Sequence, residues 1–68
     1  MGKQEKKLTD RELKILSLLS EGLTKSVIKG TLHISHITLE KDLAVLKAKF
    51  NAFNTVNLIY LAAKSGVI

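Results

Sequence analysis

The sequence predicts a compact all-α domain of four helices. Three observations favour this class: apolar residues recur three or four positions apart in successive segments, a helix-capping residue precedes each segment, and no segment alternates with the two-residue period of a strand. The 68 residues are enough for one small domain. Cysteine is absent, so no disulfide can support so small a core, which must depend on helix packing or on oligomerisation.

The first helix is expected to begin after Thr9. Glu12 follows three residues later, and this pair has the pattern of a capping box, in which each side chain accepts a hydrogen bond from the other residue's backbone amide. Gly22 is expected to end the helix, because glycine adopts the left-handed conformation found past helix ends. The apolar side of this helix comprises Leu13, Ile15, Leu16 and Leu19.

The seven residues before Leu8 lack apolar periodicity and include three lysines. We expect residues 1–7 to form a basic, flexible arm, either a solvated leader or a functional segment.

The second and third helices are expected to lie close together. Thr24 can cap the second helix, a short break follows at His33 and Ile34, and Ser35 can cap the third. The apolar side of the second helix comprises Val27, Ile28 and Leu32. The third helix has one narrow apolar stripe, formed by Leu39, Leu43, Leu46 and Phe50. A short helix, a tight turn and a longer helix make a central helix-turn-helix.

The fourth helix can be capped by Asn54 or Thr55, and Gly66 marks its end. Its inner side is expected to comprise Val56, Ile59, Tyr60 and Ala63. If they stay exposed, three further residues would form a dimer interface, namely Leu58, Leu61 and Ala62. The alternative for these three residues is simple packing in the core of a small domain.

The formal net charge of +5 favours a nucleic acid as partner, although membrane surfaces and acidic proteins also attract a basic chain. No segment approaches the roughly 20 apolar residues that cross a bilayer, so no membrane partner is expected. The first residues are polar and lack the apolar core of a secretory signal. We therefore expect a cytoplasmic protein.

The chain resembles the LuxR-type, or GerE-like, DNA-binding domain over residues 8–68. The matching motifs are LTxRE at residues 8–12, EGLT at residues 21–24 and LxISxxT at residues 32–38. The resemblance implies a domain of a bacterial transcription regulator that binds double-stranded DNA. It also implies that the third helix enters the major groove and that the fourth helix pairs two copies in a homodimer.

The sequence departs from this family at positions that bear on function. The family usually has lysine or another polar residue at the positions of Ile37, Glu40 and Ala48. Asp42 stands where a histidine is common, and Asn54 stands where an arginine often partners the residue matching Glu12. Glu12 therefore needs another partner, or it serves only as a cap.

A helical wheel places a mildly apolar ridge opposite the buried stripe of the third helix, with charges of both signs at its edges. The residues expected to contact DNA, mainly through phosphates, are Lys25, Ser26, Thr38, Lys41, Val45 and Lys49. Sequence preference would depend on Thr38, Lys41, thymine methyl groups or DNA shape. Glu40 and Asp42 either repel phosphate or favour the helix start and pair with nearby lysines.

A second interpretation treats the ridge as a protein-binding surface on a helix-turn-helix that no longer reads DNA. The residues of this surface would be Ile37, Ala44, Val45 and Ala48. Enzymatic chemistry is not expected, because the sequence has neither a glycine-rich phosphate loop nor a nucleophile motif. His33 and His36 lack further metal ligands nearby, so we expect no metal and no other cofactor.

Overall fold

The computed structural model describes residues 7–68 and contains four helices and no strand within that range. The helices are α1 (Asp10–Ser20), α2 (Lys25–Leu32), α3 (His36–Phe50) and α4 (Thr55–Lys64). The predicted all-α class with a central helix-turn-helix is confirmed. The predicted basic arm lies outside the described residues, apart from Lys7. None of the four helices is both long and apolar enough to cross a lipid bilayer.

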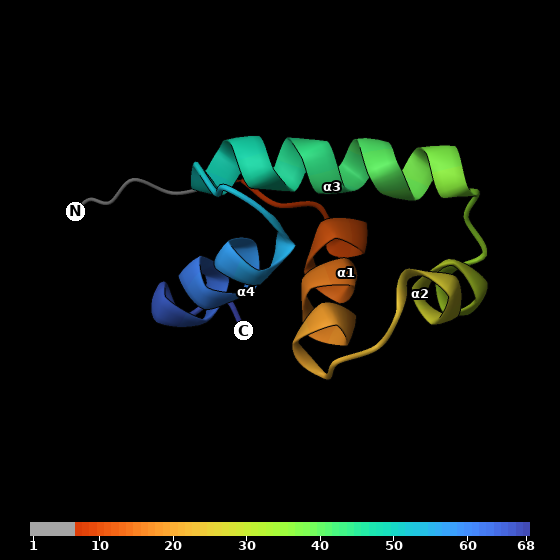
Figure 1. Cartoon of the computed structure of the whole chain (residues 1–68), viewed down its shortest axis with the longest axis horizontal. Helices are drawn as coiled ribbons and strands as arrows, with labels where there is room; N and C mark the ends of the chain where they lie inside the picture. Colours follow the sequence, from red (N-terminus) through yellow and green to blue (C-terminus); the bar gives the residue numbers. More distant parts are fainter. Residues whose placement is uncertain (1–6) are drawn as a thin grey trace.

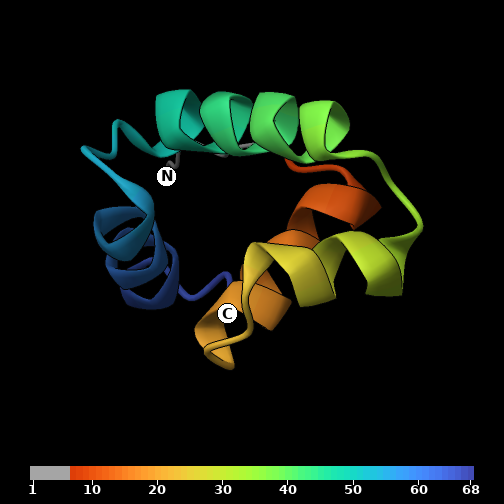
Figure 2. The same cartoon turned by 45° about the vertical axis from the view of Figure 1, so that its right-hand side comes forward.

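The longest helix, α3, runs along one side of the molecule, and the other three helices lie beneath it (Figure 1). α3 packs against α4 towards its C-terminal end and against α2 at its N-terminal end. α1 lies between α2 and α4 and packs against both, as the turned view also shows (Figure 2). One long side of α3 is therefore left without a covering helix.

Each helix begins with the side-chain cap that the sequence predicts. At α1 the capping box is complete: the Glu12 amide donates to Thr9 Oγ1 at 3.1 Å, and the Thr9 amide donates to Glu12 Oε1 at 3.0 Å. The caps of the other helices accept from the backbone amide three residues on, and they are Thr24, Ser35 and Asn54. Such a cap stabilises a helix by about 1 kcal/mol, so the helix starts are specified locally.

A residue with left-handed backbone conformation follows each helix, and it is a glycine in two cases and another residue in the other two. Gly22 and Gly66 have φ of 84° and lie just beyond α1 and α4, as predicted. The ends of α2 and α3 use His33 and Asn51 instead, with φ of 56° and 59°. Beyond His33, the Ile34 amide donates to the Lys29 carbonyl at 3.1 Å, which closes the turn of the helix-turn-helix.

The core lies between α3 and the three helices beneath it. The predicted α3 stripe is confirmed, because all four of its members are buried. The other helices contribute Ile15, Leu16, Leu19, Ile28, Leu58 and Ala62 to the same cluster. Leu13 and Val27 were expected on the inner sides of α1 and α2, but they are 38% and 47% exposed.

The face of α4 that contacts the core differs from the predicted one. Leu58 and Ala62 are fully buried, whereas Val56 and Tyr60 are 76% and 57% exposed. Ala63 is also exposed, so the prediction was wrong for three of its four residues. The reason is that α4 has an unbroken apolar run over residues 58–63, so more than one side of the helix offers apolar residues to the core.

Because α4 buries a different face from the expected one, the three residues of the predicted dimer interface are not exposed together. Leu58 and Ala62 have no exposed surface to offer a second copy, and Leu61 is only partly exposed and packs against the core cluster. The large apolar side chains that α4 does expose are those of Val56 and Tyr60.

Candidate nucleic-acid interface

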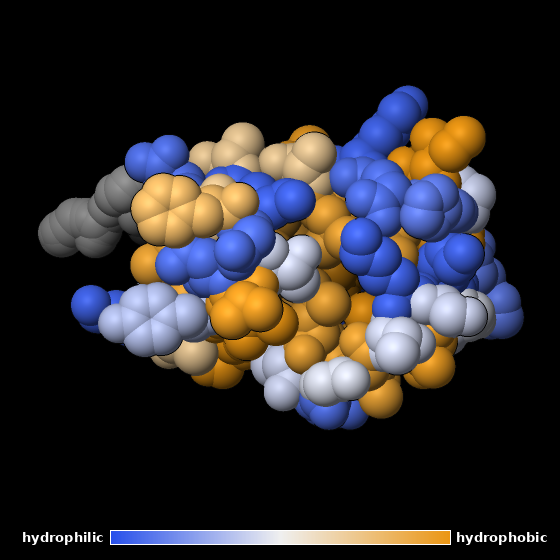
Figure 3. Space-filling model, viewed as in Figure 1, coloured by the Kyte–Doolittle hydropathy of each residue, from blue (hydrophilic) through white to orange (hydrophobic). Residues whose placement is uncertain are grey.

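The uncovered side of α3 is the ridge that the helical wheel predicts. Ile37 is 68% exposed and Val45 is 44% exposed, and the ridge is completed by the exposed residues Lys41, Ala44 and Ala48. In Figure 3, blue hydrophilic and orange or tan apolar side chains are mixed along the upper edge of the molecule, where α3 lies. The burial of the leucine stripe produces this arrangement, because a helix turns by about 100° per residue.

One edge of the ridge contains Glu40, which is paired with two basic side chains. Lys25 Nζ, from the start of α2, lies 2.9 Å from Glu40 Oε2, and His36 Nε2 lies 3.8 Å from the same oxygen. The hydrogen bond from Lys25 lowers the pKa of Glu40, and the charges of Lys25, His36 and Lys47 act in the same direction. The negative charge of Glu40 is therefore balanced across the helix-turn-helix.

The opposite edge contains Asp42, which is paired with Arg11 of α1. Arg11 Nε donates to Asp42 Oδ2 at 2.7 Å, and Arg11 Nη2 donates to Asp42 Oδ1 at 3.2 Å. This two-pronged geometry matches the planar guanidinium to both carboxylate oxygens. Both acidic residues of α3 are thus paired with basic residues of other helices, Glu40 with a lysine of α2 and Asp42 with an arginine of α1.

Lys49 lies further along this edge and has a structural role. Its Nζ atom lies 2.8 Å from Glu12 Oε1 and 2.8 Å from the Lys7 carbonyl oxygen. Burial raises the pKa of Glu12, but hydrogen bonds from Lys49 and the Thr9 amide, together with the Lys49 charge, bring it below its ordinary value of 4.5. Lys49 therefore supplies the partner that the family usually provides at the Asn54 position, and Glu12 is both cap and ion-pair member.

The predicted DNA-contact residues lie in three places. Thr38, Lys41 and Val45 share one side of α3, at positions i, i+3 and i+7. Lys25 and Ser26 are exposed at the start of α2, where the ion pair with Glu40 brings Lys25 beside α3. Lys49 is set apart from the rest, because its side chain is only 30% exposed and its ammonium group is already bound.

Two residues at the interface were not among the predicted contacts, Arg11 and His36. Arg11 is 31 positions from its partner, and no periodicity connects residues so distant in the sequence. His36 lies one turn before Glu40 on the same helix, so the spacing of four residues was the available signal. Within residues 7–68, Lys41 and Lys47 are the lysines of α3 that make no ion pair.

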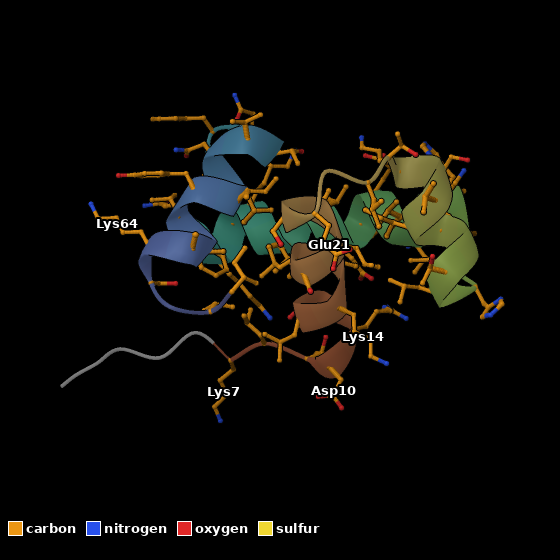
Figure 4. All side chains as sticks on the ribbon, turned by 90° about the horizontal axis from the view of Figure 1, so that it is seen from below. Lys7, Asp10, Lys14, Glu21 and Lys64 are labelled. Carbon is orange, nitrogen blue, oxygen red and sulfur yellow. The ribbon has the colours of Figure 1, made fainter. Side chains whose placement is uncertain are left out.

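The side of the molecule away from the ridge carries charges of both signs. Seen from below in Figure 4, α3 lies behind the other helices, and the labelled side chains in front include Lys14, Glu21 and Lys64. Among the described residues, no three His, Cys, Asp or Glu side chains gather as a metal site would require. The ridge of α3 and the start of α2 are therefore the strongest candidate for a site.

An exposed second helix of a helix-turn-helix, flanked by basic side chains, defines a class of protein, the DNA-binding domains of transcription regulators. Residues 6–62 match the family of bacterial regulatory proteins of the luxR type. This match covers most of the chain, so the protein belongs to the LuxR family, and the predicted resemblance is confirmed. A comparison with curated proteins found no match.

Proposed function

We propose that the chain binds double-stranded DNA as part of a bacterial transcription regulator, with α3 in the major groove. The major groove admits an α-helix, and α3, with 15 residues, has one uncovered side. The observation that supports the proposal most is the pairing of Glu40 with Lys25 and of Asp42 with Arg11. These pairs remove the main electrostatic objection to an acidic α3, because a lone carboxylate would repel phosphate.

Phosphate contacts would come from both helices of the motif. Lys41 lies in the middle of the ridge, and Ser26 is exposed at the start of α2. Lys25 can contact a phosphate while it stays paired with Glu40, since the pair is exposed and the ammonium group has three donors. The Thr38 hydroxyl accepts a hydrogen bond from Ser35 Oγ at 3.0 Å and retains its own proton to donate.

The test compares two lysine substitutions that change the net charge equally. Lys41→Glu places an acid at the centre of the ridge, whereas Lys14→Glu changes an exposed lysine of α1 that lies on the side away from it. With a random-sequence duplex in dilute buffer, we expect Lys41→Glu to weaken binding by about tenfold or more and to flatten its salt dependence. Fluorescence anisotropy measures both quantities.

Lys14→Glu should leave both quantities close to those of the wild type. Equal losses in the two variants would show that only net charge matters, and wild-type affinity in Lys41→Glu would remove this lysine from the site.

We also propose that two copies pair through α4, on a surface different from the one predicted. Phe53, Val56 and Tyr60 are 89%, 76% and 57% exposed, and in Figure 3 orange and tan side chains lie over α4 among blue and pale ones. Val56 and Tyr60 are four residues apart and therefore lie on the same side of α4, where exposed large apolar side chains mark an interaction surface. Sedimentation velocity should show concentration-dependent dimers that Val56→Glu abolishes, and a monomer at all concentrations would contradict the proposal.

The exposure of Ile37 and Val45 favours a second candidate, a protein-binding module that has kept the fold and lost DNA recognition. In that case the wild type would not bind a duplex even in dilute buffer, and Ile37→Asp would abolish partner binding without unfolding the domain. Mapping the backbone amide shifts upon duplex addition separates the candidates, because DNA binding should perturb α3 and the start of α2.

A further inference from the structure

The ridge of α3 has few groups that can hydrogen-bond to a base edge. Of its five residues, Ile37, Ala44, Val45 and Ala48 end in methyl groups, and only Lys41 can donate a hydrogen bond. Thr38 lies at the margin of the ridge and is half-buried. The part of α3 that would enter the groove is therefore mainly aliphatic.

An aliphatic surface distinguishes the bases because it cannot form hydrogen bonds with their polar groups. All four bases present polar groups in the major groove, thymine only its O4 acceptor, and covering such groups with isoleucine or valine leaves them without hydrogen-bond partners. Thymine presents a C5-methyl group, which is the apolar group of the four bases in this groove. A ridge of this composition thus fits thymine better than any other base.

The charges around the ridge fit DNA better than an apolar protein helix. Lys41 lies between the aliphatic residues, and it makes no ion pair within residues 7–68. Both acids at the edges are compensated by Lys25 and Arg11, and the chain has a net charge of +5. A hydrophobic partner would have to desolvate the Lys41 ammonium group, whereas a duplex offers it phosphates or base acceptors.

We propose that Ile37 and Val45, with the neighbouring alanines, recognise thymine C5-methyl groups, so that the preferred duplex presents thymines to α3. This inference rests on the proposed DNA binding and adds the class of sequence that is recognised. Ile37 and Val45 lie eight residues apart, slightly more than two helical turns, and would therefore contact different base pairs along the groove.

The test removes the methyl group and nothing else from the DNA. Binding of the full chain to a short duplex of alternating A·T and T·A pairs is compared with binding to the same duplex containing deoxyuridine in place of thymidine. We expect the thymine duplex to bind more tightly, by about fourfold for each methyl group that the ridge buries. In the reverse experiment, 5-methylcytosine in an alternating G·C duplex should tighten binding relative to cytosine.

Two serine variants assign the effect to the ridge, and a third is the matched control. Ile37→Ser and Val45→Ser should each reduce the ratio of thymine to uracil affinity, because both side chains are exposed and the fold does not depend on them. Ile68→Ser makes the same change at an exposed isoleucine at the C-terminal end, which lies on the side of the molecule away from α3 (Figure 1), and should leave the ratio unchanged. Circular dichroism verifies that each variant remains helical.

The possible outcomes distinguish failure of methyl recognition from failure of the proposed DNA binding. Equal affinity for the thymine and uracil duplexes would overturn methyl recognition and leave DNA binding intact. A ratio that persists in both Ile37→Ser and Val45→Ser would overturn the assignment to the ridge. Failure to bind any duplex in dilute buffer would overturn the proposed function itself.

Discussion

The ion pairs at the start of α2 and at the C-terminal end of α3 look alike in distance but differ in environment. Lys25 and Glu40 are 2.9 Å apart, with side chains that are 48% and 41% exposed. Lys49 and Glu12 are 2.8 Å apart, but their side chains are only 30% and 7% exposed. The first pair is open to water and to competing anions, whereas the second is enclosed by the fold. Of these two lysines with similar partners, only Lys25 is therefore available to a phosphate.

The largest effect that we expect is on stability, when the enclosed pair is broken. Lys49→Met keeps the aliphatic stem and leaves the buried Glu12 carboxylate without its ammonium partner, so the free energy of unfolding should fall by about 2 kcal/mol. In a domain of this size, that loss lowers the melting temperature by roughly 10 °C. Thermal melts measure the change.

Lys25→Met is the matched control, because its pair is exposed, and we expect no measurable shift in its melting temperature. If the two variants melted together, the distinction between the two pairs would be lost.

The contribution of the Lys49–Glu12 pair should also be visible in the pH dependence of the free energy of unfolding. The pKa of Glu12 in the folded protein is lowered below its ordinary value of 4.5, so the stabilisation is present above about that pH and is lost as the pH falls through the folded pKa. Urea unfolding at a series of pH values should therefore show a steeper loss of stability below pH 4.5 in the wild type than in Lys49→Met. Glu40 titrates in both proteins, so its contribution cancels in the difference.

An intermediate effect is expected for the pair between α1 and α3. Asp42 is 15% exposed and Arg11 is 50% exposed, which places this pair between the other two. Asp42→Asn removes the charge and retains one acceptor oxygen, so the free energy of unfolding should fall by about 1 kcal/mol. A loss as large as that of Lys49→Met would show that exposure of the arginine does not weaken the contact.

The smallest effect on stability, and an opposite effect on binding, is expected for Glu40. Glu40→Gln should leave the melting temperature unchanged, because the pair is exposed. It should also strengthen duplex binding severalfold, since the charge of Lys25 is no longer balanced by a carboxylate, and steepen the logarithmic salt dependence by about 0.9 for one additional neutralised phosphate. Anisotropy titrations at several salt concentrations measure both, and weaker binding would mean that Glu40 itself contacts a base.

Local signals in the sequence predicted the helix starts and the core side of α3. Thr9, Thr24, Ser35 and Asn54 are caps whose partners lie three residues away, so each can be inferred from a short segment. The α3 stripe was also predictable, because its members recur at helical spacing and charged residues lie between Leu39 and Leu43 and between Leu46 and Phe50. α4 lacks such separation, and only packing against α1 and α3 selects Leu58 and Ala62 as the buried residues.

The candidate site was predictable in its location but not in its electrostatics. The ridge follows from the wheel of α3, and Lys41 and Val45 lie where the sequence places them. The pairing of Lys49 with Glu12 joins residues 37 positions apart, and that of Arg11 with Asp42 joins residues 31 apart. No spacing rule reaches across such distances, so which lysine remains free depends on the tertiary structure.

The left-handed backbone at His33 limits which sequences can form the turn between α2 and α3. A β-branched side chain is strongly disfavoured at a φ of 56°, whereas glycine, asparagine and histidine tolerate it. The turn that orients α3 relative to α2 thus restricts which residues position 33 can hold, independent of any contact that its side chain makes. Valine or isoleucine there would strain this turn although every residue of the ridge stayed the same.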